Sequence, residues 1–437
     1  MERMSFRSFF EKLDREGKVV HIRKEVSPDY DAPAILNELD GKVVYFDRIK
    51  GSDMPAAGGF CSSREVIADS LGVKKEELLF SLARAIENRI EPETIVEGEC
   101  QQVIETNVDL TRLPLFTYVE GDGGKYIPSA IAVTKDPDLG RNVCFHRLML
   151  LDKNHFVARI VENRGTDTAL KKSGELDIAF CIGNTNAVLL AASTSLAPGQ
   201  DEFGMANALD KTELVKCKTI DVEVPRDCEI VLEGHITKER HSEGPFLDIT
   251  GTQDKVREQP VIEIKCITHR ERPIFQTLLP GRWEHRLLMG MPKEPTIYNE
   301  VNKVCKCKNV LITPGGCSWL HAVVQIKKEK PDDGRKAIEA AFQGHHSLKH
   351  CVVVDEDIDI YDLNDVEWAL STRYQADKDS IIKPNQPGSS LDPSGDLSEG
   401  KKATTCKAGA DATIPLEKKD KKFFRGEYKK INIKDYM

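Results

Sequence analysis

The sequence lacks several signals that would assign a function directly. No run of about 18 apolar residues occurs in the 437-residue chain, so we expect no membrane-spanning segment. The GxxxxGK[ST], HExxH, GxSxG and GxGxxG patterns are absent, and with them the usual signatures of P-loop NTPases, zinc proteases, serine hydrolases and dinucleotide-binding domains. Residues 1–18 alternate charged and apolar side chains and lack the apolar core of a signal peptide, so we expect a cytoplasmic protein.

Basic residues do not predominate, and closely spaced cysteine pairs are nearly absent. The chain has 62 Lys and Arg against 71 Asp and Glu, a net charge of −9, which argues against a nucleic-acid partner. None of the 12 cysteines belongs to a C-x-x-C pair, and only Cys305 and Cys307 lie close together. A single C-x-C pair is weak support for a metal site, so we interpret the set as structural or idle thiols.

The chain contains enough apolar residues for more than one hydrophobic core, since they make up 40% of the sequence. Residues 1–100 predict an N-terminal α/β domain. Its first helix is expected to begin after Ser5, to end at Gly17 and to bury one apolar face. That face consists of Phe6, Phe9, Phe10 and Leu13.

Three further regions differ in residue pattern and composition. Residues 101–275 hold many short strand patterns separated by turns, with one helix near 205–216, which favours a β-barrel or open barrel. Residues 276–382 alternate strand-like and helix-like runs and predict a second α/β domain. Residues 383–437 are rich in Pro, Gly, Ser and Lys and predict an extended or mobile tail that makes oligomer contacts.

The segment RNVCFHRLMLL (residues 141–151) carries polar side chains where a strand should be apolar. In a continuous strand, Arg147 shares a face with Val143 and Phe145. The arginine is either a structural residue whose guanidinium reaches the rim, or a buried cation that pairs with a carboxylate of substrate or protein. The residues alone leave both interpretations open.

Glu202 lies in or just before the first turn of an expected helix. A carboxylate there commonly interacts with the helix dipole. The alternative is an oxygen ligand for Mg²⁺ or Mn²⁺, with Asn142 as a second oxygen ligand.

Glu243 and Asp248 flank a Gly-Pro-Phe turn in HSEGPFLDIT (residues 241–250). An acidic surface turn is one interpretation, and acid chemistry is the other. A carboxyl group with apolar neighbours resists ionisation and can donate a proton near neutral pH. An arginine flanked by two acids can hold one of them charged and leave the other protonated.

Five segments, in order, resemble the UbiD family of prenylated-flavin-dependent decarboxylases: RNVCFHR, DEFGMANALDKTELVKC, VPRDCEIVLEG, SEGPFLD and CVVVDEDIDIYDLNDVEWALSTR. The resemblance runs from about residue 100 to 375. It implies an α+β fold in which a central split β-barrel, similar to flavin reductases, is flanked by N-terminal and C-terminal α/β domains. It also implies prenylated FMN, a divalent metal (Mn²⁺ or Mg²⁺) that holds the cofactor phosphate, and a nearby K⁺.

The resemblance also assigns candidate residues. Arg147, Glu243 and Asp248 form the implied catalytic network, with Asp248 as the proton-transferring acid. Asn142 and Glu202 are implied metal ligands, and Ala192 and Ser193 lie near the K⁺. The implied cofactor-binding residues are Asn142, Val143, Cys144, Phe145, His146, Arg147, Arg159, Ile160, Val161, Asn163, Arg164, Gly165 and Glu202.

Two positions depart from the family pattern. Asn163 stands where many members have a third metal ligand, a histidine, and its carbonyl oxygen keeps metal binding feasible. Asp248 stands where many members have Glu, and its side chain is one methylene shorter.

The family acts on α,β-unsaturated and aromatic acids, and this chain is most similar to its archaeal branch. We therefore expect trans-anhydromevalonate 5-phosphate as substrate, with a 4-hydroxybenzoate-type acid of quinone biosynthesis as the alternative. The basic segments 268–273 (THRERP) and 281–286 (GRWEHR) are candidates for binding a substrate phosphate.

Other interpretations and partners follow from the same residues. A non-catalytic flavin-binding module, or a metal-dependent hydrolase that uses the same acids, are the alternatives of another class. The resemblance implies a flavin prenyltransferase as cofactor supplier and a homodimer or dimer-based homo-oligomer. We expect no nucleic-acid or membrane partner.

Overall fold

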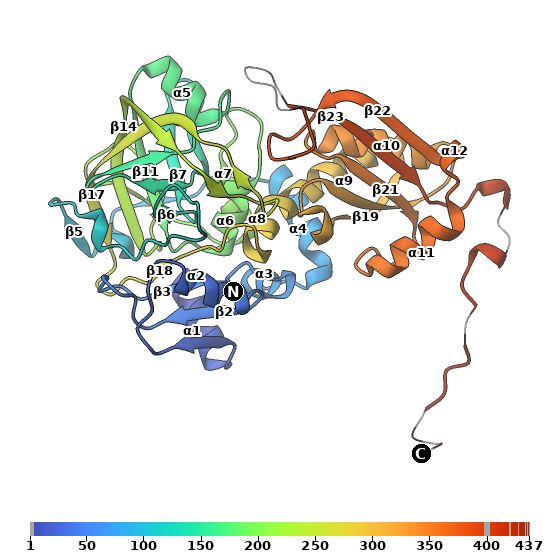
Figure 1. Cartoon of the computed structure of the whole chain (residues 1–437), viewed down its shortest axis with the longest axis horizontal. Helices are drawn as coiled ribbons and strands as arrows, with labels where there is room; N and C mark the ends of the chain where they lie inside the picture. Colours follow the sequence, from blue (N-terminus) through green and yellow to red (C-terminus); the bar gives the residue numbers. More distant parts are fainter. Residues whose placement is uncertain are drawn as a thin grey trace. The chain divides into compact units, whose positions relative to one another are not determined.

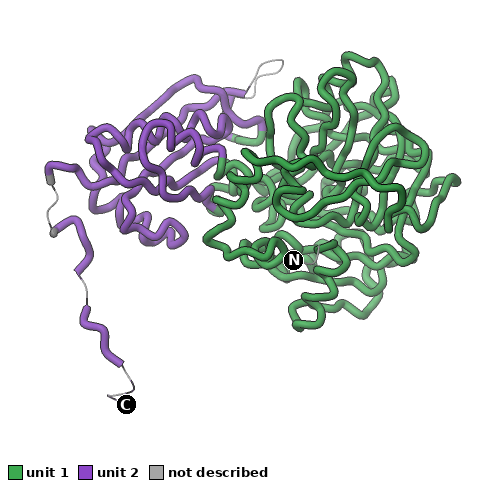
Figure 2. Tube along the Cα trace, turned by 180° about the vertical axis from the view of Figure 1, so that it is seen from behind, with its two compact units in different colours: residues 1–295, 314–319, 391–393 green, residues 296–313, 320–390, 394–437 purple. Residues whose placement is uncertain are grey.

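The computed structural model describes residues 4–396, 403–418, 421–426, 428–432, 434 and 436. They form two compact units (Figure 2). Unit 1 comprises the described residues within 1–295, 314–319 and 391–393, and unit 2 comprises the rest. The mixture of helices and sheets in both units confirms an α+β protein.

The N-terminal part of unit 1 is built on a four-stranded sheet of order β1-β2-β3-β18. The predicted first helix is confirmed: the Ser5 side chain caps it, the four predicted apolar residues are buried, and Gly17 follows with a φ of +68°. The sequence of residues 62–89 predicts two short helices with a break near Gly72, and Gly72 does end the third helix in a left-handed conformation. The elements are α1 (Phe6–Arg15), β1 (Val19–Ile22), α2 (Asp31–Glu38), β2 (Val43–Phe46), β3 (Ala56–Gly58), α3 (Arg64–Leu71), α4 (Leu78–Glu87) and β18 (Phe275–Gln276).

A nine-stranded sheet dominates the rest of unit 1 (Figure 1). Its order is β6-β9-β10-β17-β14-β11-β7-β8, with β5 paired to β17. The strands are β5 (Val103–Glu105), β6 (Tyr126–Ile127), β7 (Ile131–Asp136), β8 (Gly140–Phe145), β9 (Leu148–Leu150), β10 (His155–Ala158), β11 (Leu176–Ile182), β14 (Ile230–Glu243) and β17 (Arg257–His269). All neighbouring pairs along this order are antiparallel.

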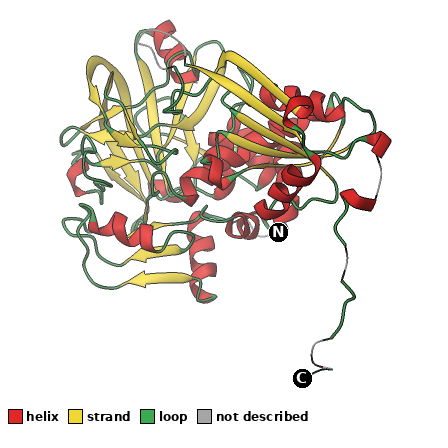
Figure 3. Ribbon diagram, turned by 45° about the vertical axis from the view of Figure 1, so that its right-hand side comes forward, coloured by secondary structure: helices red, strands yellow, loops and turns green. Residues whose placement is uncertain are grey.

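The expected continuous strand through Arg147 is wrong. Strand β8 ends at Phe145 and β9 begins at Leu148, so His146 and Arg147 lie in a break between two strands. β8 is at one end of the strand order and β9 is next to the other end. A two-residue connection can join them only if the sheet curls until its two ends approach each other, and Figure 3 shows this curvature.

Side chains on the two faces of this sheet belong to two different hydrophobic cores. On β11, Phe180 and Ile182 enter one core, and Ala179 and Cys181 enter the other, as strand alternation requires. The second core also contains α6 (Asn186–Ser193), α7 (Glu202–Leu209) and α8 (Trp283–Gly290), while α5 (Gly165–Ser173) packs on β7 and β11. The helix expected near 205–216 is α7, which starts earlier and ends at Leu209, and strand β12 (Leu214–Lys216) follows it.

Two small sheets complete unit 1. One has the order β13-β12-β4, from β4 (Thr94–Ile95), β12 (Leu214–Lys216) and β13 (Glu223–Pro225). The other pairs β15 (Phe246–Leu247) with β16 (Gln253–Asp254) and forms a flap directly after β14. Asp254, discussed below, lies in this flap, and two further acids, Glu243 and Asp248, precede and follow β15.

Unit 2 contains a five-stranded sheet of order β19-β20-β21-β23-β22. Its elements are β19 (Lys306–Ile312), β20 (His321–Lys327), α10 (Asp333–Gly344), β21 (His350–Asp355), α11 (Leu363–Arg373), α12 (Ala376–Asp379), β22 (Ser380–Pro387) and β23 (Thr404–Asp411), and α9 (Glu294–Asn302) leads into it. The strand β20–helix α10–strand β21 run is the predicted βα arrangement with a parallel pair.

Part of the expected tail is sheet instead. β23 pairs with both β21 and β22, so the chain after residue 383 contributes a strand to the interior of the sheet. The small and polar residues of this strand are not typical of an interior strand, so the sequence did not predict it. Gly409 packs directly against Ile338, where a larger residue would not fit. Residues 397–402 of that expected tail lie outside the described residues, as do 419, 420, 427, 433, 435 and 437.

Candidate active site

The break between β8 and β9 positions Arg147 at the seam of the curled sheet. Its backbone carbonyl accepts a hydrogen bond from the Arg159 N–H at 3.1 Å, which continues the β9–β10 pairing past the end of β9. The side chain then leaves the sheet towards the flap formed by β15 and β16.

Arg147 binds three carboxylates. Nε and Nη2 donate to the two oxygens of Glu243 at 2.8 and 2.9 Å, and Nη1 donates to Asp248 Oδ2 at 2.8 Å. Nη2 also donates to Asp254 Oδ2 at 3.0 Å. The sequence interpretation in which Arg147 reaches the rim is therefore wrong, and the buried, carboxylate-bound guanidinium is confirmed.

These groups are almost completely removed from solvent. The exposed fractions of the side chains are 9% for Arg147, 0% for Glu243, 13% for Asp248 and 7% for Asp254. The guanidinium carbon lies 4.8 Å from the centre of the Phe246 ring, which covers one face of the cation. Charge-assisted hydrogen bonds in such a site are strong, and so is the cost of losing one partner.

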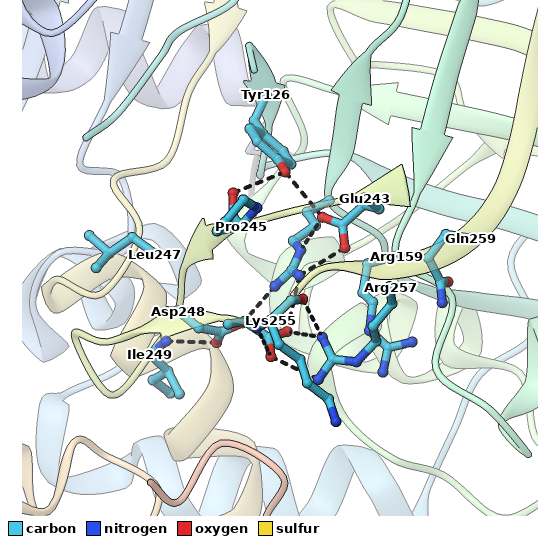
Figure 4. Close-up of polar contacts among 12 residues, drawn as sticks. Tyr126, Arg159, Glu243, Pro245, Leu247, Asp248, Ile249, Lys255, Arg257 and Gln259 are labelled. Atoms are coloured by element: carbon cyan, nitrogen blue, oxygen red, sulfur yellow. Dashed lines mark hydrogen bonds and ion pairs between the residues drawn. The ribbon is translucent and has the colours of Figure 1, made fainter. Parts of the chain in front are cut away.

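The turn between Glu243 and Asp248 brings both acids to the same guanidinium. Gly244 has a φ of +101°, a conformation that L-residues with a side chain rarely adopt. The carbonyl of Pro245 and Glu243 Oε1 lie 3.4 and 3.3 Å from the Tyr126 hydroxyl, which holds the turn against β6 (Figure 4). Asp248 accepts the Ile249 N–H at 2.6 Å, and its own backbone is held by Thr252.

Sequence reasoning missed the third acid and its partner. Asp254 accepts two hydrogen bonds from Arg257, at 2.6 and 2.8 Å, in addition to the one from Arg147. The available signal was the Asp–x–x–Arg spacing soon after Asp248, but that spacing is common in surface turns. Only the fold shows that the pair is buried.

Burial and charge act in opposite directions on these groups. Burial alone would lower the pKa of Arg147, but hydrogen bonds and charges from Glu243 and the other acids raise it above its ordinary value. Burial alone would raise the pKa of Asp254, and the hydrogen bonds and charges of Arg257 and Arg147 outweigh it, so that pKa lies below its usual range. Burial lowers the pKa of the neighbouring His285, so its ring is neutral near pH 7.

A second polar cluster forms around His146, the other residue of the β8–β9 break. Burial lowers the pKa of His146 to about 4, so its ring is neutral. His146 Nδ1 donates to the Arg159 carbonyl at 3.0 Å, and Nε2 accepts from the Thr166 hydroxyl at 2.9 Å. Thr166 in turn accepts from Asn142 Nδ2 at 3.3 Å, and Cys144 Sγ lies 3.6 Å from the same hydroxyl. Because Asn142 Nδ2 is the donor in this series of hydrogen bonds, Asn142 Oδ1 is turned towards Gly165.

Gly165 leaves room for the oxygen of that amide. A Cβ at residue 165 would lie 2.0 Å from Asn142 Oδ1, so only glycine permits this approach. Glu202 lies at the start of α7 and accepts the Val143 N–H at 3.0 Å. Burial raises the pKa of Glu202 to about 8, which marks a carboxylate that a cation would stabilise.

The donor set thus fits a hard divalent cation. Helix α7 and helix α6 both pack against β8, which carries Asn142 and Val143. Within the described residues, no group of three or more His, Cys, Asp or Glu side chains could hold a metal. Oxygen ligands in addition to Asn142 and Glu202 would have to come from the cofactor phosphate, the backbone or water, as is usual for Mg²⁺ and Mn²⁺.

The other predicted cofactor-binding residues lie on β8 and in the segment between β10 and α5. Phe145 is half-buried at the end of β8, and the Ile160 N–H donates to Gln259 Oε1 at 2.8 Å. Val161 and Asn163 are exposed, and Asn163 has a φ of +60°. Arg164 is the N-cap residue of α5 and is exposed.

Ala192 and Ser193 lie in the last turn of α6. The Ser193 hydroxyl donates to the carbonyls of Leu189 and Leu190 at 3.0 and 2.9 Å. The C-terminal end of a helix favours a cation, so the backbone carbonyls there suit K⁺. Among the described residues, no hydrogen bond joins these two to Asn142 or Glu202.

Lys293 is a further residue that sequence reasoning missed. Burial and the charge of Arg164 lower the pKa of Lys293 to about 8, and its Nζ donates to Ser195 Oγ at 2.7 Å. Lys293 is half-buried and Arg164 is exposed, and two cations whose charges act on each other favour a bound anion. A lone lysine in the MPKEP segment offered no sequence signal for this.

The two basic segments considered for phosphate binding differ in their surroundings. In segment 268–273, Arg270 is committed to Glu229 and to the carbonyl of Asp227. In segment 281–286, Arg286 donates to the carbonyl of Ile249, next to Asp248, at 3.4 Å. Only the second segment adjoins the acidic cluster.

Known protein families and relatives match the chain over most of its length. Models described as the N-terminal, Rift-related and C-terminal domains of 3-octaprenyl-4-hydroxybenzoate carboxy-lyase (UbiD) match residues 10–86, 93–283 and 286–412. An anhydromevalonate phosphate decarboxylase of Methanosarcina mazei is 44% identical over 424 residues, which cover 95% of this chain and 98% of the relative. Its counterpart from Methanocaldococcus jannaschii is 44% identical over 400 residues, 90% of this chain and 93% of the relative.

Two solved structures of one UbiD-class enzyme, HmfF from Pelotomaculum thermopropionicum, are similar to the whole chain. The complex with FMN has a TM-score of 0.94 at 37% identity and covers 99% of this chain and 100% of its own. An evolved dimeric form in complex with prenylated FMN has a TM-score of 0.90 at 35% identity, with the same coverage.

Proposed function

Because the chain belongs to the UbiD family of carboxy-lyases, we propose that it decarboxylates trans-anhydromevalonate 5-phosphate to isopentenyl phosphate, without net oxidation and with prenylated FMN as cofactor. Two archaeal relatives that carry this decarboxylase name match at least 90% of the chain. The central domain of the curled nine-stranded sheet would be the split barrel that holds the flavin.

The chain has residues suited to each part of the cofactor site. Asn142 and Glu202 would bind Mn²⁺ or Mg²⁺ at the cofactor phosphate, with Asn163 in the place of a third ligand. The N-terminus of α5 and the Arg164–Lys293 pair provide positive potential for that phosphate. K⁺ would bind at the Ala192–Ser193 end of α6. A flavin prenyltransferase would supply the cofactor, and the functional assembly would be a homodimer or a larger homo-oligomer.

The prenylated flavin, when bound, would supply the electron sink for loss of CO₂. The remaining work is done by this chain's own side chains. Arg147 holds Asp248 by a hydrogen bond of 2.8 Å in a site nearly free of solvent. The electron pair of the broken C–CO₂ bond stays on carbon, and the Asp248 carboxyl delivers the proton that forms the new C–H bond. Asp248 then recovers a proton from water.

The observation that carries this proposal is the single guanidinium that gathers Glu243 and Asp248 in a buried bend. The phosphate of the substrate would meet the basic segment 281–286, since Arg286 adjoins the Asp248 loop. These groups would bind the substrate at one end and protonate it at the other.

The test uses protein co-expressed with a flavin prenyltransferase. Release of CO₂ is measured with trans-anhydromevalonate 5-phosphate and, separately, with 4-hydroxybenzoate. We expect rapid release from the first acid only, and its loss in Asp248→Asn with the cofactor absorption spectrum unchanged. Release from 4-hydroxybenzoate alone would assign the chain to aromatic acids. Full activity in colourless protein would replace flavin chemistry with metal-dependent chemistry.

A further inference from the structure

Arg147 binds three acids, one more than the two acids of the proposed catalytic network. The third, Asp254, is the last residue of β16, on the flap opposite β15. It connects Arg147 to Arg257, the first residue of β17, which donates to both Asp254 oxygens and to the Lys255 carbonyl at 3.1 Å. A second guanidinium is thus attached to the proton-transfer network through Asp254.

The charges of this cluster do not cancel when every group is ionised. Two guanidinium groups contribute +2 and three carboxylates contribute −3, which leaves −1. One proton on one acid makes the sum zero. Because these side chains are at most 14% exposed, an uncompensated charge is costly and the singly protonated state is favoured.

The contacts decide which acid holds that proton. Glu243 receives two hydrogen bonds from Arg147, and Asp254 receives three from two arginines. Asp248 receives one guanidinium hydrogen bond and is the most exposed of the three acids. Cationic donors stabilise a carboxylate, so Asp248, which has the fewest of them and the greatest exposure, is the acid of this cluster best placed to exchange a proton.

We propose that Asp254 and Arg257 are a positioning pair for proton transfer: they hold the guanidinium of Arg147 in place and set the charge balance that leaves the proton on Asp248. This inference rests on the proposed function, since it assigns Asp254 and Arg257 a part in that reaction. Neither residue delivers the proton itself.

Other charged and titratable groups face the same cluster. Arg286 and His285 of α8 adjoin the Asp248 loop, and the Tyr126 hydroxyl contacts Glu243. Asp122 accepts backbone N–H groups of Tyr118, Val119 and Leu247, and Lys255 adjoins Asp254. None of these is altered in the variants below, so their contribution is the same in each.

Two substitutions should move the pH dependence of turnover in opposite directions. In Asp254→Asn the cluster is neutral with Asp248 ionised, so the alkaline limb of kcat should shift to lower pH. In Arg257→Gln one negative charge is in excess, so the limb should shift to higher pH. Each shift should be about 1 pH unit, as for single charges at such separations. The double variant should return the limb close to that of the unmodified enzyme.

A readout that needs no turnover separates this inference from the proposed function. The side-chain carboxyl carbon of Asp248 is followed by ¹³C NMR across pH in protein without cofactor, and Asp248→Asn assigns its signal. The same opposite shifts are expected there. If the unmodified enzyme releases no CO₂, the proposed function fails, while the carboxyl titration still decides the charge balance.

Controls distinguish positioning from a structural role. Arg257→Lys keeps the charge and should leave the limb in place, even if kcat falls. If Asp254→Asn does not fold, Arg257→Gln and Arg257→Lys carry the test, because they alter the same balance from the other partner. Unchanged limbs, or shifts of the same sign in Asp254→Asn and Arg257→Gln, would overturn the proposal.

Discussion

Replacing Arg147 by lysine tests the geometry of the site while keeping its charge. The guanidinium makes four hydrogen bonds to three carboxylates and lies against the Phe246 ring. A lysine ammonium is a point charge at the end of a flexible chain and cannot reproduce a planar fork that reaches three acids. We therefore expect at least two of the four hydrogen bonds to be lost.

The size of the effect follows from those bonds. A hydrogen bond to a charged group contributes roughly 1.5–3 kcal/mol, so Arg147→Lys should lower the free energy of unfolding by about 3 kcal/mol or more. Displacing Asp248 by about 1 Å from the reacting carbon should lower kcat about 10²-fold. The first quantity is measured by chemical denaturation of the cofactor-free protein, and the second by CO₂ release from the cofactor-loaded enzyme.

A matched control lies on strand β14. Arg240 is exposed and its side chain contacts only a backbone carbonyl, that of Glu258, in the described hydrogen bonds. Arg240→Lys should therefore change neither quantity. If Arg147→Lys kept kcat within about threefold and stability within about 1 kcal/mol, planar recognition of the three acids could not be what positions Asp248.

Three further predictions concern other parts of unit 1. Asp248→Asn should lower kcat by about 10²–10⁴, as expected for loss of a general acid, with unchanged cofactor absorption; a smaller loss would assign the proton to another group. Gly165→Ala should weaken Mn²⁺ binding in an electron paramagnetic resonance titration, because its Cβ would displace Asn142 Oδ1, whereas unaltered binding would remove Asn142 from the ligand set. Glu284 should make stability depend on pH: burial raises its pKa to about 7 despite hydrogen bonds from the Gly59 and Cys61 N–H groups, so the protonated form is favoured in the folded state.

The sign of the Glu284 effect follows from that raised pKa. The stabilisation is fully present below the ordinary pKa of 4.5 and is lost as the pH rises through about 7. Relative to Glu284→Gln, whose side chain does not titrate, the free energy of unfolding should fall by about 2–3 kcal/mol between pH 5 and 8. Denaturant titrations at several pH values measure it, and a difference that is constant with pH would be incompatible with a buried, protonated Glu284.

Local sequence patterns predicted the parts of the fold that depend on near neighbours. Helix α1 follows from the spacing of its four apolar residues, the Ser5 cap and Gly17, all within 13 residues. The break at Gly72 is of the same kind. Strand order is different, because β8 and β9 are consecutive in sequence yet lie towards opposite ends of the sheet, and no local pattern encodes that arrangement.

The tail illustrates a second limit. Low-complexity composition predicted an extended segment, but β23 is an interior strand of the unit 2 sheet. Its small residues are required by the close approach of helix α10, as at Gly409 against Ile338. A composition that resembles a linker can equally arise from tight packing, and only the tertiary partner distinguishes the two.

Predicting the acid–arginine network requires both the sequence and the tertiary fold. The family resemblance selected Arg147, Glu243 and Asp248, and the fold brings them together across 96 and 101 residues of sequence. The resemblance did not indicate Asp254. Its proposed role depends on the balance of charges around Arg147, and that balance matters only because the site is buried. In water, a third carboxylate beside a guanidinium contributes little. In this site, where solvent cannot compensate the extra negative charge, Asp254 together with Arg257 determines whether the one mobile proton stays on Asp248.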